Sequence, residues 1–512
     1  MDALQQSRHY GAFLAGWSAP AVHLSVQAVA QRPRIERVDS PTTPALRLRL
    51  RGAGRQRSAA SFSLEAIALG LLLACITAEA AVLQVGIDDL DEGYFLQQAT
   101  RIYRYDQLPY RDFESLYTPG LTYLHVLLFW LHGGVWLLGA RLLALGGRAA
   151  LVGMMYVLAR PLVKNPLWAA LPGVVLLLAF DDAPVRWEPH PGWLSTAFAL
   201  VAVWCLTRGI SARWLVAAGL AAAGSYAFKQ NTGVFILGAL LLRCGLNRRA
   251  LLPVAAFGTA TALWLVPLAI GVGDVKLLAG FVGAANVADL FAPPEPTMLV
   301  PLACLIAGTV VLRRRATWLL LAGMCLYLTQ FPRMDTLHLV WSAPLLLVVG
   351  AAAMERLPRI WSALALACVV LLAWPTMTQR VDLVRTALTD LYGLELPQAT
   401  ASDLGHAVKH VQDESVSNEP IFVYPTAPLV YVLADRPNPT RFDHLNPGAA
   451  TPVQIESLIG DLQRTDVSVV VVSDYWRSAW GPPGPNATLD QWLAANFVTV
   501  ADDGSYRVVR RL

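Results

Sequence analysis

Long apolar runs, separated by short polar and charged segments, dominate the middle of the chain. The first run, from Phe62 to about Val85, reaches the roughly 20 residues that a helix needs to cross a bilayer. Further apolar runs follow at Val135 to Ala159, Leu167 to Phe180, Trp193 to Leu206, Trp214 to Phe228, Val234 to Leu242, Leu251 to Val272, Met298 to Leu312, Trp318 to Gln330, Leu337 to Met354 and Trp361 to Trp374. This pattern predicts a polytopic α-helical membrane protein with about 11 transmembrane helices.

The pattern changes at both ends of this apolar region. Residues 1–60 carry many arginines and several prolines without sustained periodicity, which predicts a disordered basic cytoplasmic tail and leaves open whether it belongs to the mature protein. After Trp374, four short apolar strands (Ile421 to Tyr424, Val467 to Val472, Phe497 to Val500 and Tyr506 to Val509) alternate with helical stretches. We therefore expect a transmembrane module over residues 61–379, with a first external loop at residues 86–134, and a small α/β soluble domain over residues 380–512.

The basic residues indicate how the chain is oriented in the membrane. Alternate loops are basic: residues 160–165, 208–213, 243–249, 313–315 and 355–359. Thr118 to Leu131 is apolar for only about 14 residues, so we expect an interfacial helix there rather than a membrane span. Counting that segment as a span would put the later basic clusters outside. The pattern thus predicts a multi-pass protein of the cell membrane whose N-terminus is cytoplasmic. The first loop, which holds the active site, and the C-terminal domain are expected to be extracytoplasmic.

Composition narrows the class of protein further. Hydrophobic residues make up 55% of the 512 residues and charged residues 15%, whereas charged residues are near a quarter of a usual soluble domain. The net charge of +4 arises from short basic clusters between apolar runs and gives no indication of nucleic-acid binding. The six cysteines lie in or at the ends of apolar runs, so neither a disulfide framework nor a zinc site is indicated.

The segment from Ile87 to His132 differs from the other connections because it is rich in ionisable side chains. These are Asp88, Asp89, Asp91, Glu92, Asp106, Asp112 and Glu114, beside Arg101, Arg104 and Arg111. A connecting loop needs only to be short and polar, so this density predicts an active-site loop. The Asp91-Glu92 pair opens an amphipathic helix, and a Pro-Tyr-x-Asp-Phe turn at residues 109–113 and a Thr-Pro-Gly segment follow.

These motifs resemble the first external loop of GT-C superfamily membrane glycosyltransferases of the protein mannosyltransferase and aminoarabinose transferase types, which use dolichyl- or undecaprenyl-phosphate sugars. The resemblance covers roughly Phe62 to Trp374. It implies an inverting glycosyltransferase in which Asp91 is the catalytic base and Glu92 supports it. The residues by themselves also permit a capping box of Asp89 and Glu92, and they leave Asp88 and Asp89 as alternative bases.

Sugar transfer from a polyprenyl phosphate requires few chemical groups. The leaving phosphate is already a stable anion, whereas the acceptor hydroxyl must lose a proton to a positioned carboxylate. Cations must hold the phosphate, and the candidates are Arg333, His338, Lys229 and Arg101. Candidate substrate-binding residues are Asp112, Tyr110, Glu188, His190 and Asp335. Each group also has a structural explanation. Arg333 and Asp335 could form an ion pair at a turn, Lys229 could extend its ammonium to the membrane interface, and Glu188 and His190 could belong to an interfacial belt.

The expected partners are the polyprenyl-phosphate sugar donor, membrane lipids and an acceptor that is a cell-envelope glycan, lipid or protein. The sequence does not name the sugar or the acceptor, and it leaves a divalent cation open as a cofactor. A secondary transporter or lipid-linked sugar flippase is the alternative function. Transporters usually carry ionisable residues inside their spans and show internal repeats, whereas here the charges lie in loops and no repeat is visible.

Overall fold

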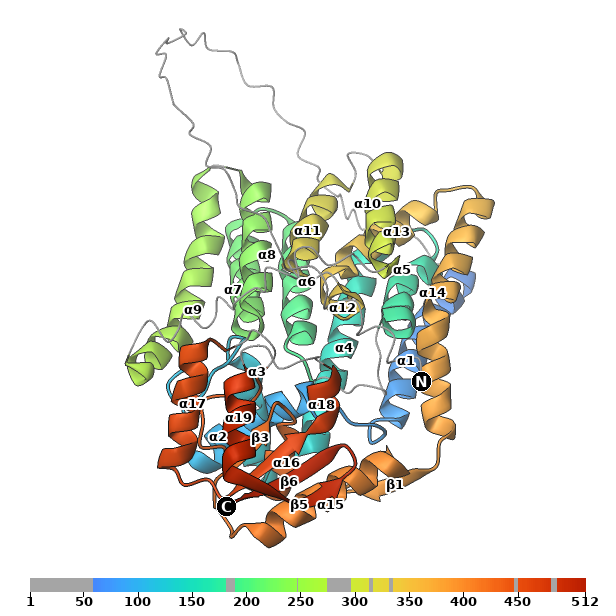
Figure 1. The fold of residues 1–512 in the computed structure, drawn as a ribbon. Coiled ribbons are helices and arrows are strands. Elements are labelled where there is room, and N and C mark those ends of the chain that lie inside the picture. The colour runs from blue at the N-terminus through green and yellow to red at the C-terminus, as the bar shows by residue number, and fades with distance from the viewer. Residues whose placement is uncertain are drawn as a thin grey trace, which may run out of the picture. The chain divides into compact units, whose positions relative to one another are not determined.

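The computed structural model describes residues 59–180, 189–245, 247–273, 296–312, 316–330, 335–445, 450–479 and 486–512. The chain divides into two compact units, Met1–Gln56 and Arg57–Leu512. The predicted tail over residues 1–60 therefore lies almost entirely outside the described residues, and everything below concerns the second unit (Figure 1).

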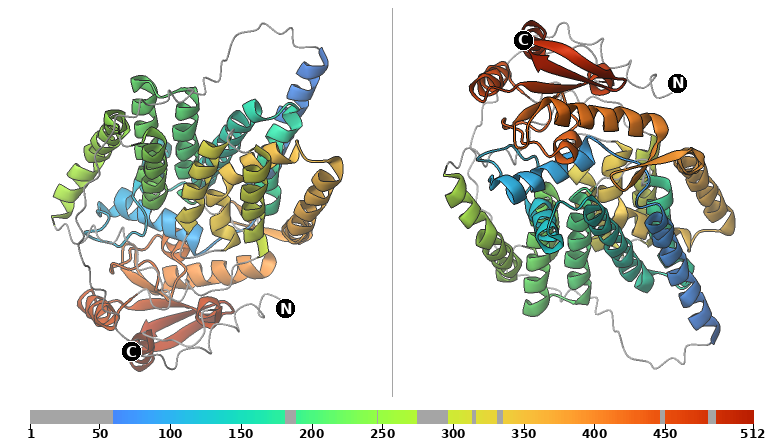
Figure 2. Two further views of the ribbon diagram at one scale, coloured as in Figure 1. Left: turned by 90° about the horizontal axis from the view of Figure 1, so that it is seen from above. Right: turned by 90° about the horizontal axis from the view of Figure 1, so that it is seen from below.

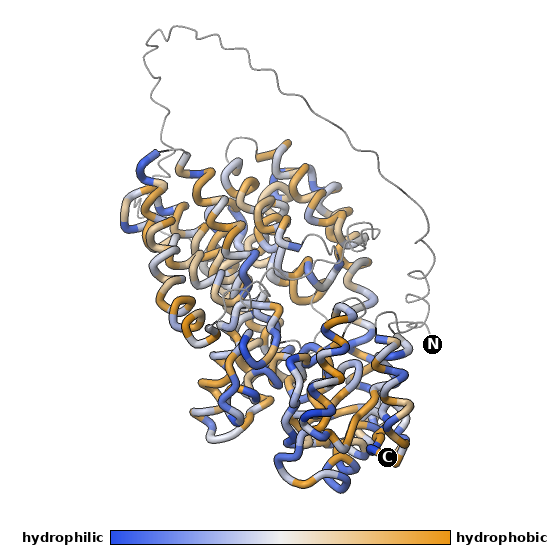
Figure 3. Tube along the Cα trace, turned by 60° about the vertical axis from the view of Figure 1, so that its left-hand side comes forward, coloured by the Kyte–Doolittle hydropathy of each residue, from blue (hydrophilic) through white to orange (hydrophobic). Residues whose placement is uncertain are grey.

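Helices occupy most of the region in which membrane spans are expected. Their bounds are α1 (Ala59–Ala81), α4 (Leu137–Ala159), α5 (Pro166–Val175), α6 (Gly192–Arg208), α7 (Ala212–Phe228), α8 (Gln230–Cys244), α9 (Leu251–Val272), α10 (Leu299–Ala307), α11 (Thr317–Tyr327), α12 (Thr336–Ser342), α13 (Pro344–Met354) and α14 (Arg359–Arg385). Among the described residues, four stretches are long and apolar enough to cross a membrane: Ser63–Ala81, Leu137–Leu162, Arg248–Val272 and Arg359–Leu383. Figure 3 shows many hydrophobic residues along the helical part of the chain.

Three segments differ from the expected spans or refine them. The apolar run Leu337 to Met354 is broken into α12 and α13, because Pro344 at the start of α13 lacks the N–H that a continuous helix would need. The run that ends at Trp374 continues as α14 to Arg385. The short run Thr118 to Leu131 forms α3 (Gly120–His132), whose 13 residues span only about 20 Å.

The C-terminal region contains a mixed sheet covered by helices. Strands β3 (Ile421–Tyr424), β4 (Val469–Ser473), β6 (Tyr506–Arg511) and β5 (Phe497–Asp503) lie in the order β3-β4-β6-β5, with only β3 and β4 parallel. A hairpin of β1 (Leu388–Leu391) and β2 (Leu394–Pro397) precedes it. The helices are α15 (Gln398–Glu414), α16 (Leu429–Ala434), α17 (Pro452–Arg464), α18 (Asp474–Ala479) and α19 (Ala487–Asn496). Strand β4 consists of four valines and a serine. All five residues are buried, so both faces of the sheet are covered at this strand.

Helix α2 (Asp91–Tyr105) lies between the long helices and this C-terminal region, as the views in Figures 1 and 2 agree. It packs on α3 on one side and on α16 on the other. The approach to α16 is so close that a Cβ on Gly93 would lie 2.4 Å from the backbone nitrogen of Leu429. Ten consecutive residues of α2, Glu92 to Arg101, are therefore buried. The amphipathic helix expected from the sequence is covered on both faces.

Candidate active site

The start of α2 is held by Asp88 rather than by the capping box of Asp89 and Glu92 that the sequence also permitted. One carboxylate oxygen of Asp88 accepts hydrogen bonds from the backbone N–H groups of Leu90 (3.1 Å) and Asp91 (3.0 Å). Glu92 reaches back to the backbone N–H of Asp88 at 3.4 Å. The reciprocal bonding that this alternative assigned to Asp89 and Glu92 is made one residue earlier, by Asp88, and the Asp89 side chain makes other contacts.

Glu92 is fully buried and forms a bidentate ion pair with Arg141 of α4. The two nitrogen–oxygen distances are 2.6 and 2.8 Å, and Arg141 also donates to the backbone carbonyls of Leu83 and Gly86, each at 2.9 Å. Burial raises the pKa of the Glu92 carboxyl, and the Arg141 guanidinium opposes that rise. The ion pair ties the first turn of α2 to a long apolar helix.

Asp89 connects the same turn to the C-terminal region. Its carboxylate accepts a hydrogen bond from the hydroxyl of Tyr506 (2.6 Å) and another from the indole N–H of Trp476 (3.1 Å). Burial raises the pKa of Asp89 to about 6; the hydrogen bond from Tyr506 lowers it and the neighbouring Asp88 charge raises it. Asp89 is thus engaged by two side chains that lie nearly 400 residues further along the chain.

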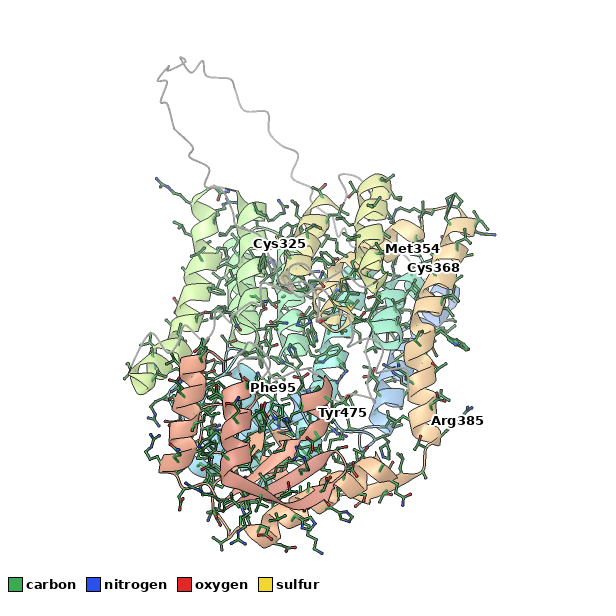
Figure 4. The ribbon with its side chains drawn as sticks, viewed as in Figure 1. Phe95, Cys325, Met354, Cys368, Arg385 and Tyr475 are labelled. Atoms are coloured by element: carbon green, nitrogen blue, oxygen red, sulfur yellow. The ribbon has the colours of Figure 1, made fainter. Side chains whose placement is uncertain are left out.

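Asp91 is the first residue of α2 and is half-buried. One helical turn later, on the same face, Phe95 contacts two residues from other segments: its ring lies 5.7 Å from the His190 ring and 5.9 Å from the Tyr117 ring. Figure 4 labels Phe95 at the level where the long helices meet the C-terminal region. Phe95 therefore joins the acidic start of α2 to the group of residues around His190.

His190, Lys229 and Trp341 form the centre of this group although they are far apart in sequence. The His190 ring stacks on the Trp341 ring with centroids 3.7 Å apart, and the Lys229 ammonium lies 4.6 Å from the Trp341 ring centroid and 5.8 Å from that of Tyr117. Lys229 lies in the break between α7 and α8 and is only 5% exposed. Gly192 permits the stacking, since a Cβ there would lie 2.5 Å from Trp341 atoms.

The hydrogen bonds of His190 define its tautomer when it is neutral. Its Nδ1 accepts from the Gly192 backbone N–H at 2.9 Å, so its proton lies on Nε2, which faces the Tyr117 hydroxyl at 3.0 Å. Burial, followed by the charges of Lys229 and His338, holds the pKa of His190 well below its usual range. With His190 neutral, Lys229 contributes a buried positive charge beside Trp341.

His338 and Asp335 reach the same cluster from the start of α12. Asp335 caps α12 by accepting from the His338 backbone N–H (2.9 Å), and its carboxylate lies 2.6 Å from the His338 Nδ1. The His338 ring makes an edge contact with Trp341 at 5.6 Å. Of the other residues expected here, Arg333 and Glu188 lie outside the described residues.

Arg101, Tyr110 and Asp112 lie instead at the far end of α2. The buried Arg101 guanidinium donates to Asp443 (2.7 Å), the carbonyl of Thr440 (2.6 Å) and Gln107 (2.7 Å). Asp112 pairs with Arg111, which lowers the pKa of Asp112. The Tyr110 hydroxyl donates to the Tyr117 carbonyl at 2.5 Å. Through these contacts Arg101 joins the loop to the C-terminal region, whereas Tyr110 and Asp112 bond to residues of the loop itself. That the three residues bind the donor or substrate stays a prediction.

An open cleft of about 580 Å³ lies beside these residues. It is bounded by the end of α2, the following loop and α17, and its lining includes Asp106, Arg111, Arg441 and Arg464. Within the described ranges, no three His, Cys, Asp or Glu side chains are placed to hold a metal ion together.

Comparison with known proteins was made for both sequence and structure. No protein-family model matches the sequence, and no curated protein matches it. The fold is similar to that of ArnT from Cupriavidus metallidurans in the apo state, with a TM-score of 0.58, 14% sequence identity and coverage of 88% of this chain and 98% of that one. For the same transferase bound to undecaprenyl phosphate, the TM-score is 0.54 and the sequence identity 16%, with coverage of 88% of this chain and 98% of that one. For the Archaeoglobus fulgidus oligosaccharyltransferase in the apo form, the TM-score is 0.53 and the sequence identity 11%, with coverage of 83% of this chain and 72% of that one.

The chain has the GT-C fold. The resemblance noted in the first loop is thus confirmed at the level of the fold, over most of the chain. Four described helices are long and apolar enough to cross a membrane, which supports a membrane protein. The expected number of about 11 spans goes beyond what the described helices and this likeness establish.

Several residues of the site were not found from the sequence. Trp341 and Tyr117 looked like ordinary aromatic residues of apolar segments, and nothing in their spacing singled them out. Arg141 carried a usable signal, because an ionisable residue within an apolar run usually has a specific partner. Tyr506 and Trp476 gave no signal, since their contact with Asp89 depends on how the C-terminal region folds back onto α2.

Proposed function

We propose that this protein is an integral membrane, inverting glycosyltransferase that moves a monosaccharide from a polyprenyl-phosphate donor to a cell-envelope glycan, lipid or protein. The observation that carries the proposal is the buried Lys229 ammonium, held beside Trp341, Tyr117 and His190 in a chain with the GT-C fold. A buried cation near the ends of apolar helices suits an anionic headgroup whose lipid chain lies along those helices. One similar structure, ArnT, was solved bound to undecaprenyl phosphate.

In the proposed reaction Asp91 acts as the general base. Its carboxylate removes the proton of an acceptor hydroxyl, the hydroxyl oxygen forms a bond to the anomeric carbon, and the bond from that carbon to the phosphate oxygen breaks. The electron pair leaves with the polyprenyl phosphate, so no general acid is required. Attack opposite to the leaving phosphate inverts the anomeric configuration.

The remaining residues have supporting roles in this proposal. Lys229 stabilises the phosphate as its charge develops, with Arg333 and His338 as further donors from the segment before and within α12. Asp335 orients His338 through the 2.6 Å contact with its Nδ1. His190 and Trp341 form the wall of the donor site. Glu92, through Arg141, and Asp89, through Tyr506 and Trp476, hold the first turn of α2 in which Asp91 lies.

The proposal extends to the placement of the chain in the membrane. The basic turns are proposed to face the cytoplasm, and the first loop, the site and residues 380–512 to face the other side. On this topology the donor is used on the extracytoplasmic surface. The sugar, the acceptor and any requirement for a divalent cation are not specified by the proposal.

Donor turnover tests the proposal directly. Purified protein would be incubated with polyprenyl-phosphate sugars and a cell-envelope extract as acceptor, and release of polyprenyl phosphate would be followed by mass spectrometry. We expect release by the unaltered protein, loss of release in Asp91→Asn with donor binding retained, and loss of donor binding in Lys229→Ala. Donor binding that persists unchanged in Lys229→Ala would contradict the assignment of the phosphate site.

A further inference from the structure

Five arginines lie on two neighbouring turns at one end of the helices. Arg208 and Arg213 border the turn from α6 to α7, and Arg243, Arg248 and Arg249 lie at the turn from α8 to α9. Helices α7 and α9 run in the same direction, because Gly219 in the middle of α7 approaches Pro253 near the start of α9, and Tyr226 near the end of α7 contacts Phe257 further along α9. The two turns are therefore at the same end of the bundle, about 25 Å along α7 from Lys229.

These arginines have no acidic partner in the described part of the chain. Residues 207–214 and 243–251 contain no Asp or Glu, and no hydrogen bond or ion pair of the five guanidinium groups occurs within the described residues. Elsewhere the arginines behave differently, since Arg101, Arg141 and Arg507 each bind a carboxylate at 2.7 Å or closer. A cluster of like charges without counter-charges is unfavourable unless an anion outside the chain neutralises it.

Two tryptophans hold part of this cluster. The Arg208 guanidinium lies 5.6 Å from the Trp204 ring and 5.9 Å from the Trp214 ring, and Arg213 lies 5.4 Å from Trp214. The two indoles contact each other edge to face at 5.6 Å. The aromatic rings restrict the guanidinium groups without using up the hydrogen-bonding capacity of their N–H donors.

Exposed aliphatic side chains lie next to the arginines on the same helices. Ile210, Val216, Leu242 and Leu251 are 41%, 36%, 64% and 66% exposed. Adjacent guanidinium groups, indole rings and aliphatic side chains match the order of phosphate, interfacial region and acyl chain in a phospholipid leaflet. Free phosphate would use the guanidinium groups but would gain nothing from the tryptophans and aliphatic residues.

We propose that these two turns form a binding site for the headgroup of an anionic phospholipid, with Arg208 and Arg213 as the main phosphate ligands and Trp204 and Trp214 as its walls. Arg243, Arg248 and Arg249 extend the site to a second headgroup. The site is separate from the residues proposed for sugar transfer, and its existence does not depend on that reaction.

Native mass spectrometry of the detergent-purified full chain tests the site. The probe lipids are phosphatidylglycerol, which is anionic, and phosphatidylcholine, which has no net charge. Each basic residue near an anionic surface contributes about five-fold to affinity. We therefore expect Arg208→Gln/Arg213→Gln to bind phosphatidylglycerol roughly thirty-fold more weakly. The charge-matched control is Arg464→Gln/Arg510→Gln, two exposed arginines of the C-terminal region, and it should bind as the unaltered protein does.

Three results would overturn the proposal. These are equal binding of phosphatidylcholine and phosphatidylglycerol, an equal loss in the control variant, and displacement of the bound lipid by inorganic phosphate. The last result would show a site for a free anion instead of a lipid. Circular dichroism of both variants checks that they are folded. A conservative Trp214→Phe variant should keep most of the affinity, because phenylalanine retains a ring face for Arg208 and Arg213.

Discussion

The two ends of α2 have similar side chains in different surroundings. Near its start, Asp88, Asp89 and Glu92 bind other groups of the protein, and Asp91 lies at the first helical position. Near its end, Arg101 is buried and bound to Asp443. In the sequence both ends offered candidate residues, the start for catalysis and the end for binding. Among the described residues, Phe95 connects the start to the cluster around the buried Lys229, and our proposal therefore places the reaction at the start.

The largest expected difference between the two ends is in activity. Asp91→Asn should lower the rate of sugar transfer by about 10²–10⁴-fold, because the amide cannot accept the proton of the acceptor hydroxyl. The unfolding midpoint should stay close to that of the unaltered protein. Asp106→Asn, just after the last residue of α2, is the matched control, since asparagine tolerates the left-handed backbone there (φ 50°). The rate is measured as release of polyprenyl phosphate, and equal losses in both variants would contradict the proposed base.

The free energy of unfolding should depend more on the end of α2 than on its start. Arg101→Met leaves the buried Asp443 carboxylate without its ion pair, which should cost about 3–5 kcal/mol in the free energy of unfolding. The double variant Arg101→Met/Asp443→Leu should recover much of this loss, because no uncompensated charge then remains. Chemical denaturation of the three proteins measures both quantities. A stable Arg101→Met protein that no longer binds the donor would instead favour the original expectation that Arg101 contacts phosphate.

A glycine tests the wall of the proposed donor site. Gly192→Ala places a Cβ 2.5 Å from Trp341 and 2.8 Å from the His190 ring, so the stacked pair must move apart. We expect donor affinity to fall by about ten-fold with a loss of stability of about 1–3 kcal/mol. Gly238→Ala in α8 is the control, because nothing lies within 4 Å of its added Cβ. Unchanged donor binding in Gly192→Ala would remove the stacked pair from the site.

The smallest expected effect concerns Asp89 and pH. Its pKa is about 6 in the folded chain, against 3.8 for an ordinary aspartate. Between these values the folded state holds the proton more tightly than the unfolded state, so the contribution of Asp89 to stability is lost as pH rises from about 4 to about 6. Asp89→Asn should therefore gain thermal stability relative to the unaltered protein above pH 6 and show a smaller difference at pH 4. A difference independent of pH would contradict the raised pKa.

Much of the fold could be predicted because its cause is local. Apolar runs long enough to cross a bilayer predicted α1, α4, α9 and α14, and alternating short strands predicted β3, which spans Ile421–Tyr424 as expected. The break between α12 and α13 was missed although Pro344 was visible, because a proline can begin a helix as readily as interrupt one. The capping box that the sequence permitted at Asp89 is replaced by bonds to Asp88, since neighbouring acids give the same sequence signal.

For the site, the sequence by itself determined which residue types were available: acids before α2, a lysine between two apolar helices and histidines near helix starts. The first-loop motifs, which depend only on neighbouring residues, carried the resemblance to the GT-C superfamily, and the comparison confirms it at the level of the fold. Tertiary structure alone decided that Lys229, His190 and His338 meet around Trp341, and that Arg101 is bound to Asp443, 342 residues away. The physical reason is that a buried charge takes its function from its partners, and partners brought together by packing leave no pattern along the chain.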